Sequence, residues 1–340
     1  MGDGGGTLGD VGITSHAGRT WAGRRVLVTG AAGLLGGWVD RAFIEAGAAV
    51  VGLDIAWQGP VATEPAAGVQ VVDGDVRELE VLYRLLAEER IDTVIHLAAQ
   101  TLVGPAVDDP IDTFSHNIAG TWSLLEACRR AGSVRSVVVA SSDKAYGDAG
   151  GRPYRETMAL RPHHPYDMSK AAADLLTQTY AHTYGLPAAI IRCGNLYGGG
   201  DLNWSRIVPG TVRSVLEGNR PVIRSDGSLV RDYLYVRDAA VGVMSLAAAI
   251  AGRPETFRGE AFNFAGGARF SVREIVHRVL SLMDSSLEPT VEGRRLPEIP
   301  EQRVSASKAR RILGWRPQTP VNRGLLETIA WYRDHLGARA

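Results

Sequence analysis

Short apolar runs alternate with amphipathic stretches through the first half of the chain. The apolar runs are rich in valine, leucine and isoleucine, which is typical of strands buried on both faces. Predicted strands cover residues 24–29, 48–53, 69–72, 93–98, 136–140 and 188–192. Predicted helices between them cover residues 37–47, 79–88, 113–131 and 166–184. Strands that alternate with helices predict a parallel sheet covered by helices on both faces.

The regular alternation loosens after Gly194, where a glycine-rich loop follows the last strong strand signal. The later periodic segments are helices at residues 207–217, 236–251, 270–283 and 324–336, and a strand at residues 231–236. We interpret this part of the chain as a mixed lobe that closes over one edge of the sheet.

A glycine pattern joins the first predicted strand to the first predicted helix. Gly30 permits a tight turn, Gly33 lets the backbone approach a pyrophosphate, and Gly36 lets the helix pack closely on the strand. Asp54 ends the next strand, where its carboxylate would accept hydrogen bonds from an adenosine ribose. No arginine follows within residues 55–57, which favours NAD over NADP. An ordinary glycine-rich turn is the alternative.

The glycine pattern and the strand–helix alternation together predict an α/β fold with a Rossmann-type, doubly wound parallel sheet. We expect the sheet domain over residues 23–194, with elements that can recur later in the chain. A smaller mixed α/β substrate lobe is expected over residues 195–340. Residues 1–22 are polar and rich in glycine and are predicted to be a disordered tail.

A second polar group follows the predicted strand that ends at residue 140. It contains Ser142, Asp143 and Lys144, and Tyr166 and Lys170 come later, on a predicted helix. The four-residue spacing puts those two side chains on one face, one turn apart. In parallel sheets ligands bind beyond the carboxyl ends of the strands. The polar or cleft-facing residues expected at these ends are Asp54, Asp75, Ala98, Ser142 and Cys193.

Composition and charge narrow the class of protein. Lys+Arg and Asp+Glu number 37 each, so no overall charge points to nucleic acid or to a membrane surface. Cys128 and Cys193 lack metal-ligand spacing, so we expect neither a metal site nor a disulfide framework. No apolar run approaches the roughly 18 residues of a spanning helix, and the start of the chain does not resemble a secretion signal. We expect a cytoplasmic protein.

With these motifs in view, the chain resembles the extended short-chain dehydrogenase/reductase superfamily over residues 24–336, and within it the nucleotide-sugar 4,6-dehydratases. The matching residues are Gly30, Gly33 and Gly36; His96 to Gln100; Asn117, Gly120 and Thr121; Ser142 to Lys144 with Tyr146 and Gly147; Tyr166 and Lys170; Arg192, Gly194 and Asn195; and Arg231 to Tyr233. Residues 97–103, 142–144, 194–201 and 221–224 are most similar to CDP-glucose 4,6-dehydratases. Residues 231–236 are more similar to dTDP-sugar enzymes and epimerases, so the nucleotide stays open.

The resemblance implies a bound NAD, a nucleotide-diphosphate hexose as substrate, and a homodimer formed through the helices near residues 117–131 and 167–184. Combined with the patterns above, the predicted cofactor-binding residues are Gly30, Gly33, Leu34, Leu35, Gly36, Asp54, Asp75, Val76, Leu97, Ala98, Ala99, Asn117, Tyr166, Lys170 and Cys193. The predicted substrate-binding residues are Gln100, Ser142, Asn195, Arg206, Arg224, Arg231 and Arg303.

The predicted catalytic residues are Ser142, Asp143, Lys144, Tyr166 and Lys170. A free phenol has a pKa near 10, and positive charge on Lys170 and the nicotinamide would lower the pKa of Tyr166 until it can act as a base. Ser142 would align the sugar hydroxyl. The resemblance assigns Asp143 as the acid that protonates the departing C6 hydroxyl.

The resemblance also places Lys144 where dTDP-glucose dehydratases have a glutamate base for the C5 proton. An ammonium cannot accept a proton, so that role requires a neutral amine, and the alternative is that Lys144 only stabilises an enolate. A nucleotide-sugar 4-epimerase would need only Ser142, Tyr166 and Lys170. A non-catalytic NAD-binding protein is the second alternative.

Overall fold

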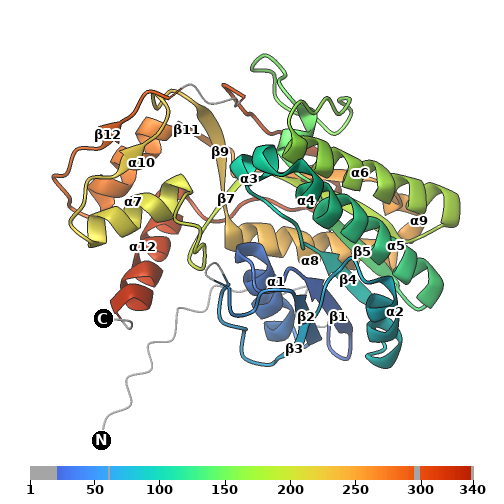
Figure 1. Cartoon of the computed structure of the whole chain (residues 1–340). Helices are drawn as coiled ribbons and strands as arrows, with labels where there is room; N and C mark the ends of the chain where they lie inside the picture. Colours follow the sequence, from blue (N-terminus) through green and yellow to red (C-terminus); the bar gives the residue numbers. More distant parts are fainter. Residues whose placement is uncertain (1–20, 60–61, 295–298, 338–340) are drawn as a thin grey trace, which may run out of the picture.

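The computed structural model describes residues 21–59, 62–294 and 299–337, and its centre is a parallel sheet of seven strands (Figure 1). The strand order is β10-β6-β5-β4-β1-β2-β3. The strands are β1 (Arg25–Thr29), β2 (Ala49–Asp54), β3 (Val69–Asp73), β4 (Thr93–His96), β5 (Ser136–Ala140), β6 (Ala188–Cys193) and β10 (Ala261–Phe264). Every neighbouring pair is parallel, which confirms the predicted Rossmann-type α/β fold.

Apolar side chains of the strands point alternately to the two faces of the sheet. On β5, Val138 packs in one core cluster, whereas Val137 and Val139 pack in the other. The first cluster is covered by α1 (Leu34–Glu45) and α8 (Val236–Gly252). The second is covered by α2 (Leu79–Glu88), α5 (Gly120–Ala131) and α6 (Pro165–Tyr184). Burial on both faces is the reason that the strands are nearly continuous apolar runs.

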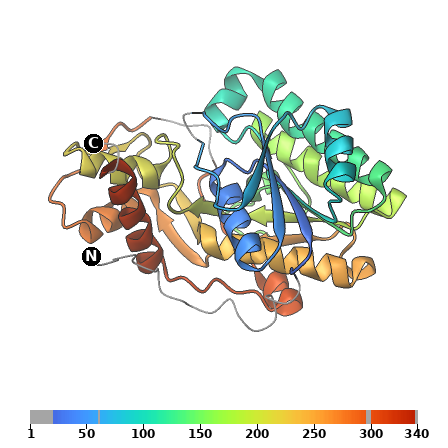
Figure 2. The same cartoon turned by 90° about the horizontal axis from the view of Figure 1, so that it is seen from below.

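The second half of the chain forms a smaller lobe beside the sheet (Figure 2). Its sheets are formed by β7 (Asn195–Tyr197), β9 (Val230–Tyr235) and β11 (Ala268–Ser271), and by β8 (Val222–Ile223) with β12 (Thr290–Val291). Its helices include α7 (Ile207–Leu216), α10 (Val272–Leu282) and α12 (Val321–Gly337), and the chain also forms the short α9 (Pro254–Phe257) and α11 (Ser307–Leu313). Buried aromatic and aliphatic side chains join these helices to β9. The lobe is therefore a mixed α/β unit, as predicted.

Four of the described elements beyond residue 194 belong with the main sheet. Strand β10 pairs with β6, and α8 covers the face that α1 also covers. The short helices α9 and α11 pack beside β6 and β10. The sheet domain is therefore built from two separate parts of the chain, with much of the lobe inserted between β6 and β10.

Several local expectations differ from the structure. The helix predicted over residues 113–131 is divided into α4 (Pro110–Phe114), a π-helical turn (Ser115–Ala119) and α5, and it follows an unpredicted short helix, α3 (Val103–Asp108). The helix predicted from residue 270 begins at Val272, because Phe270 belongs to β11. Ser271 is the N-cap of this helix and forms a capping box with Glu274.

The predicted disordered tail falls mostly outside the described residues. Its last part is ordered, because Trp21 is fully buried and packs edge-on against Phe43 of α1, with ring centroids 4.6 Å apart. The expectation of disorder up to residue 22 therefore does not hold for Trp21, whose indole is part of the core.

Candidate active site

A cleft of about 1320 Å³ lies between the carboxyl ends of the strands and the lobe. All five predicted catalytic residues line it. So do all predicted cofactor-binding residues except Asn117, and all predicted substrate-binding residues except Arg303. Apart from these two residues, the predicted site residues therefore share one cleft, and the roles predicted for them stay predictions.

The glycine loop forms a close cradle at one end of the cleft. Gly30 has a φ of +74°, and a Cβ there would lie 2.6 Å from the backbone nitrogen of Ala98. A Cβ on Gly36 would collide with the carbonyl oxygen of Gly30. Gly33 precedes α1 and provides no side-chain cap, so the first amides of the helix are open to an anion. This geometry fits the pyrophosphate of a dinucleotide.

Asp54 lies at the end of β2 beside the glycine loop. Its Oδ2 accepts a hydrogen bond from the backbone of Ala32, and its Oδ1 accepts one from the backbone of Ala56, each at 3.0 Å. Burial raises the pKa of Asp54, and these two bonds oppose that rise. The carboxylate is thus held in place at the position where a ribose hydroxyl could donate to it.

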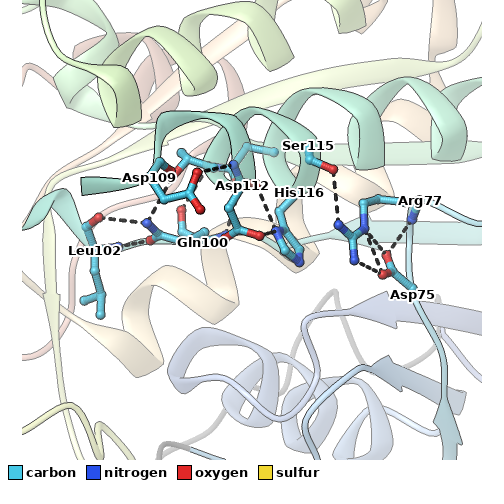
Figure 3. A network of polar contacts seen from close by, with 10 residues as sticks. Asp75, Arg77, Gln100, Leu102, Asp109, Asp112, Ser115 and His116 are labelled. Carbon is cyan, nitrogen blue, oxygen red and sulfur yellow. Dashed lines mark hydrogen bonds and ion pairs between the residues drawn. The ribbon is translucent and has the colours of Figure 1, made fainter. Parts of the chain in front are cut away.

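Asp75 and its neighbours form a polar network on one wall of the cleft (Figure 3). The Arg77 guanidinium binds both oxygens of Asp75 and also donates to Ser115 Oγ at 3.1 Å. The hydrogen bond with Arg77 lowers the pKa of Asp75. Further along the same wall, His116 contacts Asp112 at 3.1 Å. Asp75 is therefore a fixed carboxylate.

Gln100 and Asn117 hold the loop after β4, and Figure 3 shows the contact of Gln100 with Leu102. The side-chain amide of Gln100 donates to the Leu102 carbonyl at 3.0 Å and to Thr113 Oγ1 at 3.1 Å. Asn117 is buried, donates to the Gln100 carbonyl and to Ser169 Oγ, and accepts from the backbone nitrogen of Gln100. Asn117 therefore supports this loop, and its predicted contact with the cofactor stays a prediction.

Ser142, Asp143 and Lys144 lie where β5 runs into a short 3-10 turn, Asp143–Tyr146. Ser142 caps this turn, because its Oγ accepts a hydrogen bond from the backbone nitrogen of Lys144 at 3.2 Å. The same hydroxyl donates to Asp143 Oδ1 at 3.2 Å. The turn thus brings a hydroxyl, a carboxyl and an amine to the cleft within three consecutive residues.

Tyr166 and Lys170 are both buried on α6 and face the Ser142 turn. Burial raises the pKa of Tyr166 to about 12, although a hydrogen bond with Ser142 and the charge of Arg206 lower it. The expected lowering below 10 is therefore absent from the protein without its cofactor. Burial lowers the pKa of Lys170 to about 8, and its Nζ donates to the Ala140 carbonyl at 2.9 Å.

Asp143 is a buried carboxyl whose pKa is raised by burial, against the lowering effect of Lys144 and Arg231. Its Oδ2 accepts a hydrogen bond at 3.2 Å from Gln302, a buried residue that sequence patterns did not identify. A raised pKa favours the protonated carboxyl, which is the form that can donate a proton.

Arg206 and Arg224 line the cleft from the lobe. Arg206 pairs with Asp201 at 3.2 Å and also donates to Thr101 Oγ1 at 3.3 Å. Arg224 donates to the Ser205 carbonyl at 3.2 Å. Both guanidiniums are partly exposed and can reach a diphosphate by small side-chain motions.

Arg231 and Arg303 differ in position. Arg231 is buried in the wall of the cleft and donates to the Ile299 carbonyl at 2.8 Å. Arg303 donates to the Gly151 carbonyl at 3.3 Å and does not line the cleft. Arg303 therefore lies outside the cleft, because neighbours in an extended segment point to opposite sides and its neighbour Gln302 is the one that contacts Asp143. Its role in substrate binding stays a prediction.

Asn195 lies in β7 and not in the predicted loop. Asn195 lines the cleft, and its buried Nδ2 has no hydrogen-bond partner among the residues that the structure describes. An unsatisfied buried donor costs about 1–3 kcal/mol, so this amide is suited to a ligand acceptor.

Two other motif residues are structural. His96 bonds to Thr29 and Thr121 at 2.8 and 3.1 Å, and burial lowers the pKa of the imidazole to about 3. Arg192 forms a buried ion pair with Asp174 of α6 at 2.7 Å. Both positions hold strands to helices and do not face the reacting groups.

Two other kinds of feature are absent from the described residues. None of their helices is both long enough and apolar enough to cross a membrane. Within the same residues, no group of three or more His, Cys, Asp or Glu side chains is placed to hold a metal ion.

Comparisons with known proteins agree with this geometry. A model of the NAD dependent epimerase/dehydratase family matches residues 26–264. A CDP-glucose 4,6-dehydratase from Salmonella typhimurium is 31% identical over 92% of this chain and 91% of its own length. A UDP-glucose 4-epimerase from Mycolicibacterium smegmatis is 31% identical over 91% and 99%. The solved dTDP-glucose 4,6-dehydratase from Streptomyces venezuelae, with NAD bound, has a TM-score of 0.82 and 29% identity over 92% of this chain and 98% of that one.

Proposed function

The chain belongs to the NAD-dependent epimerase/dehydratase family, and from this membership we propose that it is a nucleotide-sugar 4,6-dehydratase. The substrate class is a nucleotide-diphosphate hexose, with CDP-glucose favoured, and the product is the corresponding 4-keto-6-deoxyhexose. The observation that carries the proposal is Asp143, a buried carboxyl at the cleft wall next to Ser142, whose pKa is raised by burial.

The cleft residues can bind NAD and begin the reaction. The glycine loop and Asp54 would hold the pyrophosphate and ribose, and bound NAD supplies reversible hydride transfer, away from C4 first and back to C6 at the end. Tyr166 takes the proton of the C4 hydroxyl, and Ser142 orients that hydroxyl. Positive charge beside the phenol, from Lys170 and from the oxidised nicotinamide, lowers the pKa of Tyr166 from its ligand-free value.

Elimination of water needs an acid at C6 once C4 is a ketone. The ketone makes the C5 proton acidic. A base, either Lys144 as a neutral amine or a water molecule in the cleft, accepts that proton, and departure of the C6 hydroxyl then forms the C5–C6 double bond. Asp143 donates the proton that converts the hydroxyl into water, and it ends as a carboxylate. Lys144 lies beside it, and its Nζ donates to Gln302 Oε1 at 3.4 Å. An amine there has two candidate roles, as a neutral base for the C5 proton or as an ammonium that stabilises the enolate, and either form can make this contact.

A 4-epimerase is the second candidate, since relatives of both activities are equally similar to this chain. Epimerisation uses the same C4 oxidation but releases no water, so it does not need Asp143 to protonate a leaving hydroxyl. A buried acid adjacent to the alignment hydroxyl therefore favours the dehydratase.

The CDP preference and the dimer are further parts of the proposal. Similarity to the CDP-glucose enzyme supports cytidine. Exposed apolar side chains on two adjacent helices support a homodimer: Trp122 of α5 and Met168 and Leu175 of α6 are 49%, 46% and 52% exposed. Such a face is typical of helices that pack against a second copy.

The test is incubation of the purified protein with CDP-, dTDP-, UDP- and GDP-glucose. The dehydratase converts at least one of them to a product lighter by one water, with the absorbance of a 4-keto sugar. A product of unchanged mass that is a C4 epimer would replace the dehydratase with the epimerase. No turnover of any hexose would favour the non-catalytic alternative.

A further inference from the structure

Gln302 lies directly behind the two groups that distinguish this site. It is fully buried and does not line the cleft, so it does not touch a ligand there. Its Nε2 donates to Asp143 Oδ2 at 3.2 Å, and its Oε1 accepts from Lys144 Nζ at 3.4 Å. One neutral amide therefore contacts both the carboxyl and the amine.

Backbone hydrogen bonds fix the segment that carries Gln302. The backbone nitrogen of Gln302 donates to the Val230 carbonyl at 3.1 Å, next to the bridge between Val230 and Glu301. On the other side, the Arg303 carbonyl accepts from the Tyr154 backbone nitrogen at 2.7 Å. The segment is thus held between β9 and the loop at Tyr154, and the buried carboxamide is held by its own contacts with Asp143 and Lys144.

The consequence concerns the pairing of opposite charges. Asp143 and Lys144 are adjacent in sequence and lie in the same turn, yet no ion pair joins them in the part of the chain that the structure describes. The Gln302 amide bridges the two groups, because it donates to Asp143 Oδ2 while its Oε1 accepts from Lys144 Nζ. A direct ion pair would favour the carboxylate and remove the proton that elimination needs.

We propose that Gln302 is a positioning residue that separates Asp143 from Lys144 and prevents a direct ion pair between them. Its amide holds the carboxyl by one donor bond and the ammonium by one acceptor bond, so each group keeps its own role. The catalytic consequence rests on the proposed dehydratase function, whereas the separation of the two charges does not.

The test follows the protonation of Asp143 directly. The NAD-loaded full chain is labelled with 13C at aspartate carboxyl carbons and titrated by NMR, and the Asp143 signal is identified by its loss in Asp143→Asn. Other charged or titratable groups around Asp143 are Lys144, Tyr154, Tyr166, Cys193, Arg231 and Asp232. None of them is changed in the single Gln302 variants, so a change in the midpoint there reports the substitution of Gln302.

Gln302→Met keeps the length of the side chain and removes both hydrogen bonds. The Asp143 midpoint is expected to fall by at least about one pH unit, because Lys144 can then pair with the carboxylate. Gln302→Glu places a second carboxylate beside Asp143 and should raise the midpoint instead. Opposite changes in the midpoint distinguish a positioning role from general damage. Adding Lys144→Met to Gln302→Met should abolish the fall.

Gln178→Met is the matched control, because Gln178 donates to another aspartate, Asp174, at 2.7 Å on the far part of α6. It should leave the Asp143 midpoint unchanged. In a chain that dehydrates hexoses, a midpoint lowered by about one pH unit in Gln302→Met should also slow water loss about tenfold at neutral pH, while C4 oxidation is retained. A midpoint in Gln302→Met that equals or exceeds that of the wild type overturns the inference. Failure of the wild type to release water removes the proposed function and leaves the NMR result to stand by itself.

Discussion

At the scale of single residues, Asp143 separates the two halves of the proposed reaction. C4 oxidation depends on Tyr166, Ser142 and Lys170, whereas water loss also depends on the proton of Asp143. We expect Asp143→Asn to retain C4 oxidation and to lose water elimination by about 10²–10⁴-fold, the usual contribution of a positioned acid. Single-turnover measurement of cofactor reduction beside mass analysis of the product checks this. Equal losses in both steps would contradict the role of Asp143 as acid.

Lys144 is tested by exchange at C5. If it is the base, Lys144→Ala retains C4 oxidation but loses incorporation of solvent deuterium at C5. If it stabilises the enolate, exchange is slowed but still detectable. Deuterium incorporation measured by mass spectrometry decides between them. Exchange at the wild-type rate would remove Lys144 from the mechanism.

Lys170 is expected to lower the free energy of unfolding at neutral pH and to support C4 oxidation. Because its pKa is about 8 in the folded protein and 10.5 in a solvated lysine, the buried ammonium destabilises the fold at pH 7, and the folded state gains stability as pH rises from about 8 to 10.5. Lys170→Met should therefore raise the free energy of unfolding by about 1–3 kcal/mol at pH 7 and nearly abolish C4 oxidation. Urea unfolding at pH 7 and pH 10.5 measures the effect, which should shrink at the higher pH.

At the scale of elements, strands were easier to predict than lobe contacts. Buried parallel strands are apolar runs, so their sequence reports their position. Strand β10 was not predicted, because its four residues include a buried Asn263 and follow an irregular region. Gln302 was not predicted as a site residue, because its partner Asp143 is 159 residues away and no sequence pattern links two positions so far apart. The motif residues Asn117 and Arg192 were found by resemblance, but only the structure shows that neither lines the cleft.

Helix α1 contains another buried titratable side chain besides that of Lys170, the carboxyl of Asp40. Asp40 is fully buried, and both of its carboxylate oxygens lack a hydrogen-bond partner among the described residues. Burial raises the pKa of Asp40 to about 8, so the folded state binds a proton that the unfolded state releases above about pH 4. The wild type should lose stability between pH 4 and pH 8 for this reason.

Asp40→Asn removes that dependence. We expect the variant to be more stable than the wild type by about 2 kcal/mol at pH 7.5 and to differ little at pH 4. Guanidinium unfolding at both pH values provides the comparison. Asp226→Asn, at an exposed turn, is the control and should show no such gain. A variant whose advantage over the wild type is the same at both pH values would mean that Asp40 does not titrate as described.

At the scale of the whole molecule, we expect two copies of the chain to form a dimer through the exposed apolar face of α5 and α6. The wild type should elute with twice the 36.4 kDa mass of one chain. Leu175→Arg places a charge in the centre of the face and should give monomers. Leu326→Arg, at a similarly exposed leucine of α12, is the matched control and should stay dimeric. Light scattering after size exclusion distinguishes them, and a dimeric Leu175→Arg protein would place the interface elsewhere.

The pairing of β10 with β6 also constrains how the molecule is made. The two strands meet only after the intervening residues 194–260 have emerged from the ribosome. Until then β6 is an open edge, with unpaired backbone groups that can capture another chain. Slow synthesis across the lobe would lengthen this exposure. Yield in rapid and slow expression hosts should therefore depend more on codon usage between β6 and β10 than on codon usage after β10.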